Sequence, residues 1–193
     1  MTNYSANLGS LDLVEKKVTA GGHPVMLRSW PLRPDAGELA AGLLVARDKT
    51  GQVHAYGEDL AETVGSGDGA AKDFSGTLGP VEPGIAVTDG VEAFTDDGFG
   101  TLTGSAGGTG KVDYPSGRFK VHFNAAPVNA AAIVATATHV PAGVLTRDAA
   151  AAADAVGLVC VSGPVMRAAL LVGDAPADAD SLAQLERMGV WPL

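Results

Sequence analysis

The stretch that decides the fold reads Val-Pro-Ala-Gly-Val-Leu-Thr-Arg-Asp over residues 140–148. After an alanine-rich link it continues as Gly-Leu-Val-Cys-Val-Ser-Gly-Pro-Val over residues 157–165 and as Met-Arg-Ala-Ala-Leu-Leu-Val over residues 166–172. The apolar runs predict a strand, a loop, a strand broken at Gly163-Pro164, and another apolar strand. This pattern indicates a β-rich unit. It contains no nucleophile–base pair and no metal-ligand spacing, so it points to no chemistry.

The last residues predict a short helix that closes this unit. Its apolar side chains recur at helical spacing: Leu182, Leu185 and Met188. Asp180 or Ser181 can accept hydrogen bonds from the first free backbone N–H groups, and Gly189 suits the position after the last turn. We therefore expect a helix between these signals.

Three pieces of this region, in this order, resemble the head decoration proteins of tailed bacteriophages, the lambda gpD-like family. They are Gly-Val-Leu-Thr-Arg-Asp (143–148), Val-Cys-Val-Ser-Gly-Pro-Val (159–165) and a final helix ending in Leu-Glu-Arg-Met-Gly-Val (185–190). Earlier in the chain, Gly-Glu-Leu-Ala-Ala-Gly-Leu-Leu-Val (37–45) and Gly-Gln-Val-His-Ala-Tyr (51–56) look like the first half of the same fold. The resemblance covers roughly residues 20–59 and 140–193.

The resemblance implies a mainly β fold with short helices, in which residues 21–59 and 140–193 form a β-tulip-like base. It also implies a homotrimer that binds the phage major capsid protein on the outside of the head. Residues 1–20 would then be an extended arm, with Leu8, Leu11 and Leu13 as its apolar contacts. Such an arm becomes ordered on a partner, for example by adding a strand to the edge of the partner's sheet. A dangling tail is the alternative.

The first part of the base predicts a compact hairpin. Residues 25–27 favour a short strand, and the prolines within residues 30–34 favour a rigid, non-helical turn. Residues 43–46 predict a strand, residues 48–51 a turn, and residues 52–56 the returning strand.

Residues 60–139 do not match a minimal decoration protein. Glycines in residues 65–69 indicate a flexible boundary, and residues 118–123 alternate apolar and polar side chains as a half-buried strand does. Residues 131–138 predict a closing strand. The pattern from Gly110 to Pro127 resembles a small β-module that recurs in phage structural proteins, so we expect an inserted antiparallel β-subdomain that projects from the base.

Charge and composition limit the possible partners. The net charge of −9 and the pI near 4.7 argue against nucleic-acid binding. Residues 60–140 are the most acidic part, with four basic and nine acidic side chains. Cys160 is the only cysteine, which excludes an intrachain disulfide, and its valine neighbours favour a buried thiol. Without a signal peptide or a run of about 18 apolar residues, we expect a soluble protein made inside the cell, with no membrane partner. The resemblance implies assembly in the cytoplasm of the bacterial host.

Several motifs suggest chemistry that their context does not support. Residues 107–111, Gly-Gly-Thr-Gly-Lys, lack the glycine spacing of a phosphate loop and precede a strand instead of a helix, so a hairpin loop is favoured. Three acidic side chains favour an acidic turn: Asp89, Asp96 and Asp97. Calcium binding by these carboxylates is the alternative. The histidines show no metal-like pairing along the chain: His23, His54, His122 and His139. Two of these, His54 and His122, occupy polar positions in alternating strands.

We assign no catalytic residue, cofactor or metal, and we expect a protein that is not an enzyme. Three acidic residues could serve as general acids only if the fold brought them together in a cleft: Glu38, Glu58 and Asp59. The candidates for capsid or trimer contacts in the base are two large aromatic anchors and two cations: Trp30, Trp191, Arg28 and Arg33. For each tryptophan, burial in the core is an equally good interpretation, and surface charge is the alternative for each arginine.

The sequence thus predicts a capsid decoration protein that cements the exterior of the expanded head as trimers and strengthens it against internal DNA pressure. One alternative is another virion component, such as a tail-tube or baseplate protein. A second is an adhesive or carbohydrate-binding β-module, which requires exposed aromatic side chains. The aromatic residues near the predicted loops are Phe94, Phe99 and Tyr114.

Overall fold

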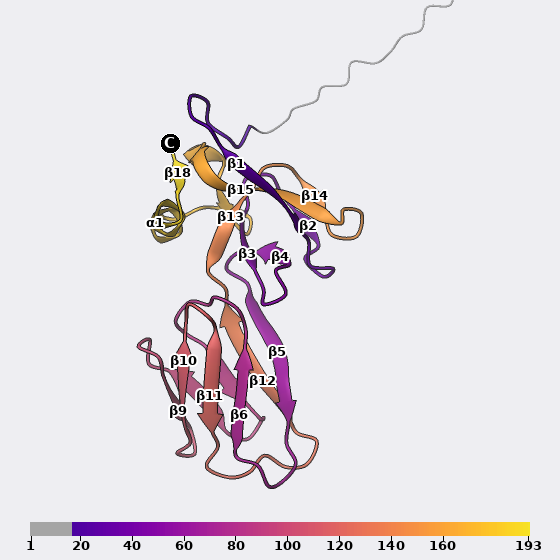
Figure 1. The fold of residues 1–193 in the computed structure, drawn as a ribbon, viewed down its shortest axis with the longest axis vertical. Helices are drawn as coiled ribbons and strands as arrows, with labels where there is room; N and C mark the ends of the chain where they lie inside the picture. Colours follow the sequence, from indigo (N-terminus) through magenta and orange to yellow (C-terminus); the bar gives the residue numbers. More distant parts are fainter. Residues whose placement is uncertain (1–16) are drawn as a thin grey trace, which may run out of the picture.

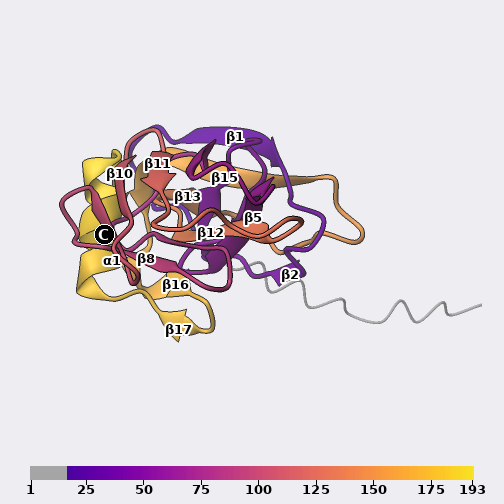
Figure 2. The same ribbon diagram turned by 90° about the horizontal axis from the view of Figure 1, so that it is seen from below.

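The computed structural model describes residues 17–193, and these form two large β sheets and two short strand pairs. The large sheets are stacked end to end (Figure 1), so they overlap when the molecule is viewed from below (Figure 2). Strands make up 48% of the structure and helices 7%, which confirms the predicted mainly β fold with short helices. Residues 1–16, with Leu8, Leu11 and Leu13 of the expected arm, lie outside the described residues.

The first sheet, here called the base sheet, has six strands in the order β1-β15-β13-β3-β4, with β18 paired to β15 in parallel. The strands are β1 (Met26–Pro31), β3 (Leu44–Arg47), β4 (Val53–Ala55), β13 (Pro141–Leu145), β15 (Val156–Val165) and β18 (Val190–Pro192). The β3–β4 hairpin is the one that the sequence predicts, with Arg47 opposite Val53.

Both faces of the base sheet are buried. In β3, Leu44 and Ala46 belong to one apolar cluster, whereas Val45 belongs to a second cluster on the opposite face. Helix α1 (Ala179–Arg187) supplies Leu182 and Leu185 to the first cluster. Short strand pairs lie beside the sheet: β2 (Glu38–Leu39) with β14 (Ala149–Ala150), and β16 (Leu171–Val172) with β17 (Ala175–Pro176). Cys160 of β15 is fully buried, as predicted.

Three expectations for the base are wrong. Strand β15 is not broken at Gly163-Pro164 but continues to Val165, because Gly163 adopts φ 114° and lets the backbone of Pro24 pass close by. The apolar segment after it forms a short 3₁₀ helix, η1 (Arg167–Ala169), before β16 begins. Trp30 and Pro31 belong to β1 instead of a turn, since they pair with the start of β15.

The C-terminal helix forms as predicted, with one difference at its start. The N-cap is Asp178, whose carboxylate accepts from the backbone N–H of Ser181 at 2.8 Å, so neither Asp180 nor Ser181 is the cap. Gly189 follows the helix at φ 87°, the left-handed conformation that favours glycine. Met188, predicted on the apolar side, is half-exposed.

The second sheet, here called the insert sheet, is antiparallel and nearly closed, in the order β5-β12-β7-β8-β9-β10-β11-β6. Its strands are β5 (Asp59–Ser66), β6 (Asp73–Thr77), β7 (Ala86–Thr88), β8 (Ala93–Asp96), β9 (Thr101–Gly104), β10 (Thr109–Asp113), β11 (Arg118–His122) and β12 (Ala132–Thr138). The alternation in β11 and the closing strand β12 are confirmed. The predicted boundary at residues 65–69 is wrong in part, because Gly65 and Ser66 lie within β5.

Two adjacent links join the sheets at a narrow waist. One leads from β4 to β5 and the other from β12 to β13, and they leave the insert sheet at the paired residues Asp59 and Thr138. Among residues 17–193, two contacts between polar side chains cross the waist, one between Lys49 and Glu62 and one between Tyr56 and Glu82.

The Tyr56 contact leads to a stability prediction. Its hydroxyl donates to Glu82 at 2.8 Å, and burial, followed by Glu82, raises the pKa of Tyr56 to about 12. We expect Tyr56→Phe to lower the unfolding free energy by about 1 kcal/mol, the usual net value of one such bond. Guanidinium denaturation measures this change, and a variant as stable as the parent would show that the bond contributes nothing.

Candidate functional site

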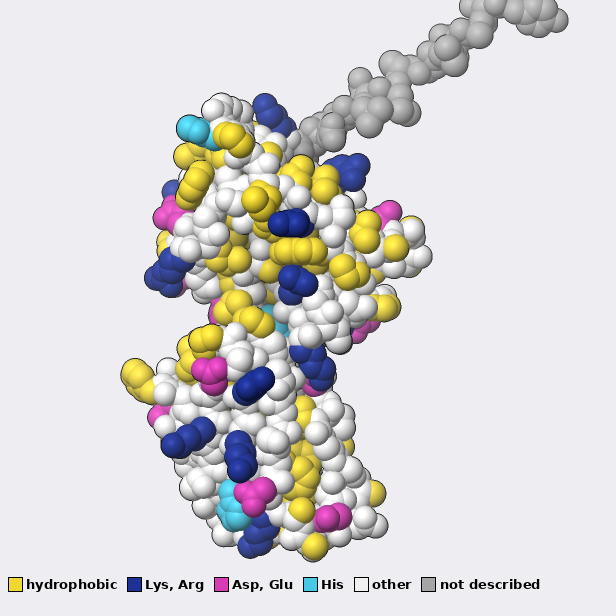
Figure 3. All heavy atoms as spheres, viewed as in Figure 1, with side chains coloured by type: hydrophobic (Ala, Val, Ile, Leu, Met, Phe, Trp, Pro, Cys, Tyr) yellow, Lys and Arg dark blue, Asp and Glu magenta, His cyan; other side chains and the backbone are white. Residues whose placement is uncertain are grey.

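Exposed apolar side chains gather at the end of the base that lies farthest from the insert. We call this set the apolar end; it comprises Met26, Leu27, Met166, Trp191 and Leu193, with exposed fractions from 40% to 69%. These residues surround the last part of β15. Figure 3 shows hydrophobic side chains, with Lys and Arg among them, over one face of the base.

Local pairing explains how Trp191 reaches the surface. Strand β18 runs parallel to β15, with Val190 opposite Gly163 and Trp191 opposite Pro164. Neighbouring side chains of a strand point to opposite faces, and Val190 is fully buried, so Trp191 points outward. Met166 lies beside Leu193, because the backbone N–H of the next residue, Arg167, donates to the carbonyl of Leu193.

Strand β1 completes the apolar end from the other side of β15. In the described part of the chain it pairs only with β15, so its second edge is open. Its burial pattern leaves side chains exposed on both faces, which is unusual for a strand of a packed sheet. Open, exposed edge strands are sites at which a second chain can add to a sheet.

A shallow groove of about 460 Å³ adjoins β1. Its lining includes the apolar side chains of Leu27 and Leu158 and two cations, Lys17 and Arg147. A groove lined by apolar side chains and cations suits a segment that carries apolar and acidic side chains.

The four base candidates from the sequence lie in different places. Arg28 is exposed on β1, on the same face as Trp30, which is half-buried and has the Arg47 guanidinium 4.4 Å above its ring. Arg33 pairs with Asp35 at 2.6 Å, which makes it the weakest contact candidate. Trp191 belongs to the apolar end on the other side of β15. Sequence reasoning missed the exposure of Met26, Met166 and Leu193, because no sequence pattern shows that β1 and β18 flank β15.

The waist carries two further grooves of about 460 and 420 Å³, which share Val140, Pro141 and Met188. Their lining is mostly apolar. None of the acidic groups considered for catalysis lines either groove: Glu38, Glu58 and Asp59.

The acids considered for calcium instead hold turns together. Asp96 accepts from the Tyr114 hydroxyl at 2.7 Å and from the backbone N–H of Gly84 and Gly98. Asp97 accepts from the N–H of Thr101 and Phe99, which lowers its pKa. Asp89 accepts from Val91 and Glu92 in a separate turn. Within residues 17–193 there is no group of three or more side chains able to hold a metal ion.

The aromatic residues near the predicted loops, Phe94, Phe99 and Tyr114, do not form an exposed aromatic surface suited to binding a sugar. Phe94 is fully buried, and Phe99 is 92% exposed at a turn. The Tyr114 hydroxyl is engaged with Asp96, and burial, followed by this bond, raises its pKa to about 12.

The histidines differ from the prediction in one respect. His122 is exposed on β11 beside Asp73, as its alternation position predicts, but His54 is buried. Spacing along the chain did not reveal that two histidines meet: the rings of His54 and His139 contact each other edge to face at the waist, with centroids 5.2 Å apart. The returning chain after β12 covers β4 there, which alternation within β4 alone does not reveal.

No helix among residues 17–193 is long and apolar enough to cross a membrane. Comparison of the chain with protein family models, curated proteins and solved structures finds no match.

Proposed function

We propose that this protein decorates and cements the exterior of an expanded phage capsid as a homotrimer, with the phage major capsid protein as its partner. The apolar end carries the proposal. Exposed Trp and Met side chains with nearby cations are typical of the centres of protein interfaces, and here they lie beside an open strand edge.

The arrangement of the two sheets supports the same function. The apolar end lies at the opposite end of the molecule from the insert (Figure 1). If the apolar end faces the shell, the insert projects outward. Residues 60–140 have a formal charge of −5, from four basic and nine acidic side chains, and such a surface keeps decorated particles apart in solution.

The mechanism is multivalent clamping. One apolar end presents a small contact, but three linked copies that span neighbouring capsid subunits bind at high effective concentration. Because the trimer binds only the assembled shell, binding stabilises the shell by mass action against the pressure of packaged DNA. The assembled protein then belongs to the virion exterior.

The test combines light scattering with sedimentation on expanded, undecorated capsids of the phage that encodes the chain. We expect a trimer that pellets with the shells and raises their disruption temperature. A monomer that ignores the shells would overturn the proposal, and recovery with tails would favour a tail-tube or baseplate component.

A matched pair of variants locates the contact. We expect Trp191→Ser to weaken shell binding about 30-fold, the effect of losing about 2 kcal/mol from an interface anchor. Phe99→Ser removes an exposed aromatic side chain from the insert and should leave binding unchanged. Equal effects of the two changes would contradict the assignment of the apolar end.

A further inference from the structure

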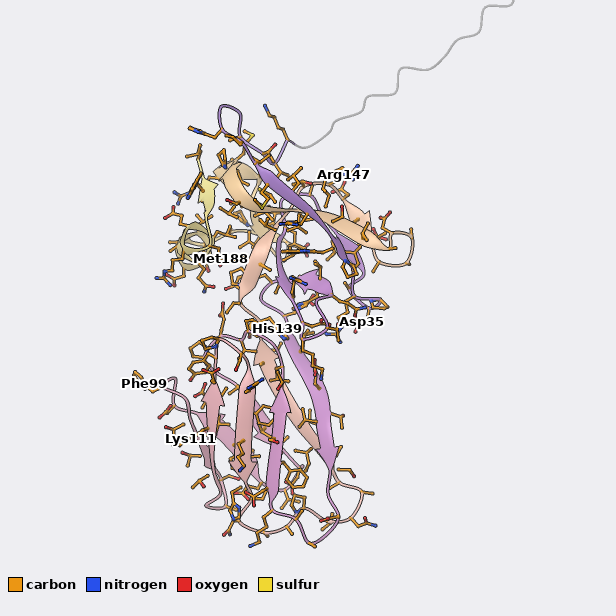
Figure 4. All side chains as sticks on the ribbon, in the orientation of Figure 1. Asp35, Phe99, Lys111, His139, Arg147 and Met188 are labelled. Atoms are coloured by element: carbon orange, nitrogen blue, oxygen red, sulfur yellow. The ribbon has the colours of Figure 1, made fainter. Side chains whose placement is uncertain are left out.

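The waist contains a pair of buried histidines that the proposed function does not use. His54 belongs to β4 of the base sheet, and His139 follows β12 where the chain returns from the insert. Both side chains are 1% exposed, and their rings meet edge to face at an interplanar angle of 70°. Figure 4 shows His139 between the two sheets.

Hydrogen bonds fix the proton on each ring. His54 Nδ1 lies 2.8 Å from the carbonyl oxygen of Ala55, and His139 Nε2 lies 2.7 Å from that of Leu78. A carbonyl oxygen only accepts, so each of these nitrogens carries the hydrogen. The other nitrogens, His54 Nε2 and His139 Nδ1, are buried and have no hydrogen-bond partner among residues 17–193. In the neutral rings each of these is a bare lone pair.

A second proton on either ring would introduce a buried charge with no acceptor for the new N–H group. Burying a charged group without a partner is costly, because the charge loses its hydration. For His54, burial is the main cause that lowers the pKa, and the charges of His139 and Arg33 lower it further. The bond to Ala55 and the charge of Asp48 oppose this effect without reversing it.

The carboxylates at the waist are already engaged by other groups. Asp48 accepts from the Thr50 hydroxyl and from the backbone N–H groups of Thr50 and Gln52. Glu62 pairs with Lys49, and Glu82 accepts from Tyr56, and neither carboxylate is hydrogen-bonded to the free nitrogen of either ring. The pair is therefore suited to a neutral state only.

The position of the pair makes its charge state relevant to how the sheets are held together. Gly79 of the insert packs against the backbone of Lys49 in the β3–β4 turn, and the N–H of Val140 donates to the carbonyl of Pro80. His139 and Val81 also form a β-bridge. We propose that His54 and His139 form an acid-sensitive latch, which holds the insert against the base while the paired rings are neutral and releases it when His54 is protonated.

The direction of the pH dependence follows from the two states. A histidine in the opened waist has its ordinary pKa of about 6.5, whereas His54 in the closed waist has a lower one. The open state therefore binds more protons, so the latch is fully closed above about pH 6.5 and weakens as the pH falls below it. Between pH 7.5 and 5.5 the titration of His54 raises the opening equilibrium up to about tenfold.

Hydrogen exchange of the full chain at these two pH values, corrected for intrinsic exchange rates, tests the latch. We expect amides around His54, Leu78 and His139 to open up to about tenfold more readily at pH 5.5, and to recover at pH 7.5. Amides of β9 and β10, far from the waist, serve as the internal control. Equal opening of the waist at both pH values would overturn the proposal.

A matched variant removes the titration while it keeps the bonds to the carbonyls. The amide of Asn can replace Nδ1–H at position 54, and the amide of Gln can replace Nε2–H at position 139. We expect the double variant H54N/H139Q to lose the pH dependence at the waist, whereas His122→Asn, a change of an exposed histidine, retains it. A pH dependence that persists in the double variant would overturn the proposal, and the wild-type exchange decides the question if that variant does not fold.

Discussion

Replacing Glu92 by leucine is expected to lower the unfolding free energy by about 3 kcal/mol, although the new side chain has a similar size. Glu92 is buried within the insert sheet. Its two carboxylate oxygens accept from the backbone N–H groups of Gly108 and Asn124 at 2.7 and 2.8 Å. Leucine leaves both donors without an acceptor, the Gly108 N–H in a buried position and the Asn124 N–H in a partly buried one, at about 1–3 kcal/mol each.

Thermal unfolding followed by circular dichroism measures this loss, and for a chain of this length we expect a melting temperature lower by about 10 °C. Glu92→Gln is the control, because its single carbonyl oxygen still satisfies one of the two donors. It should cost less than the leucine variant. A leucine variant that melts with the parent would show that these two bonds contribute no net stability.

The second large effect is expected for Gly117→Ala, at about 3 kcal/mol or more. Gly117 has φ 62°, and a Cβ atom placed on it would overlap the carbonyl oxygen of Gly79. The same approach positions the Gly117 carbonyl to accept from the N–H of Leu78 at 3.1 Å. Alanine therefore adds about 1 kcal/mol of left-handed strain and also forces two backbone segments apart.

Gly37→Ala separates these two causes. Gly37 has a similar φ of 68°, but nothing lies within 4 Å of its added Cβ position. We expect this control to lose only about 1 kcal/mol in guanidinium denaturation. If the two alanine variants were equally stable, the close approach at Gly79 would have no energetic importance.

Local patterns predict much of the fold. The alternation of residues 118–123 predicts β11, and the turn signal at residues 48–51 predicts the β3–β4 hairpin, because side-chain direction and turn conformation depend on neighbours along the chain. Gly189 is likewise a local signal, because its left-handed conformation marks the end of the helix. The helix start was misplaced by two residues, since Asp178 and Asp180 are both good caps and only the position of the first turn selects between them.

The candidate site depends on contacts between distant segments, so the sequence predicts little of it. Trp191 was a candidate by residue type alone; its exposure follows from the parallel pairing of β18 with β15. In the sequence, Glu92 resembles an ordinary surface acid. In the folded insert sheet, the backbone N–H groups of Gly108 and Asn124 lie close enough to donate to its carboxylate. The functional proposal itself combines the predicted resemblance with this surface.

By itself, the sequence determined the β-rich class, the position of several strands and turns, and the terminal helix, because these depend on periodicity and on the conformational preferences of glycine, proline and aspartate. The tertiary structure alone decided which faces are covered. His54 alternates like a surface residue yet is buried against His139, 85 positions later in the sequence, because the returning chain covers β4 at the waist. Alternation gives the direction of a side chain, and only the packing of distant segments determines what it meets.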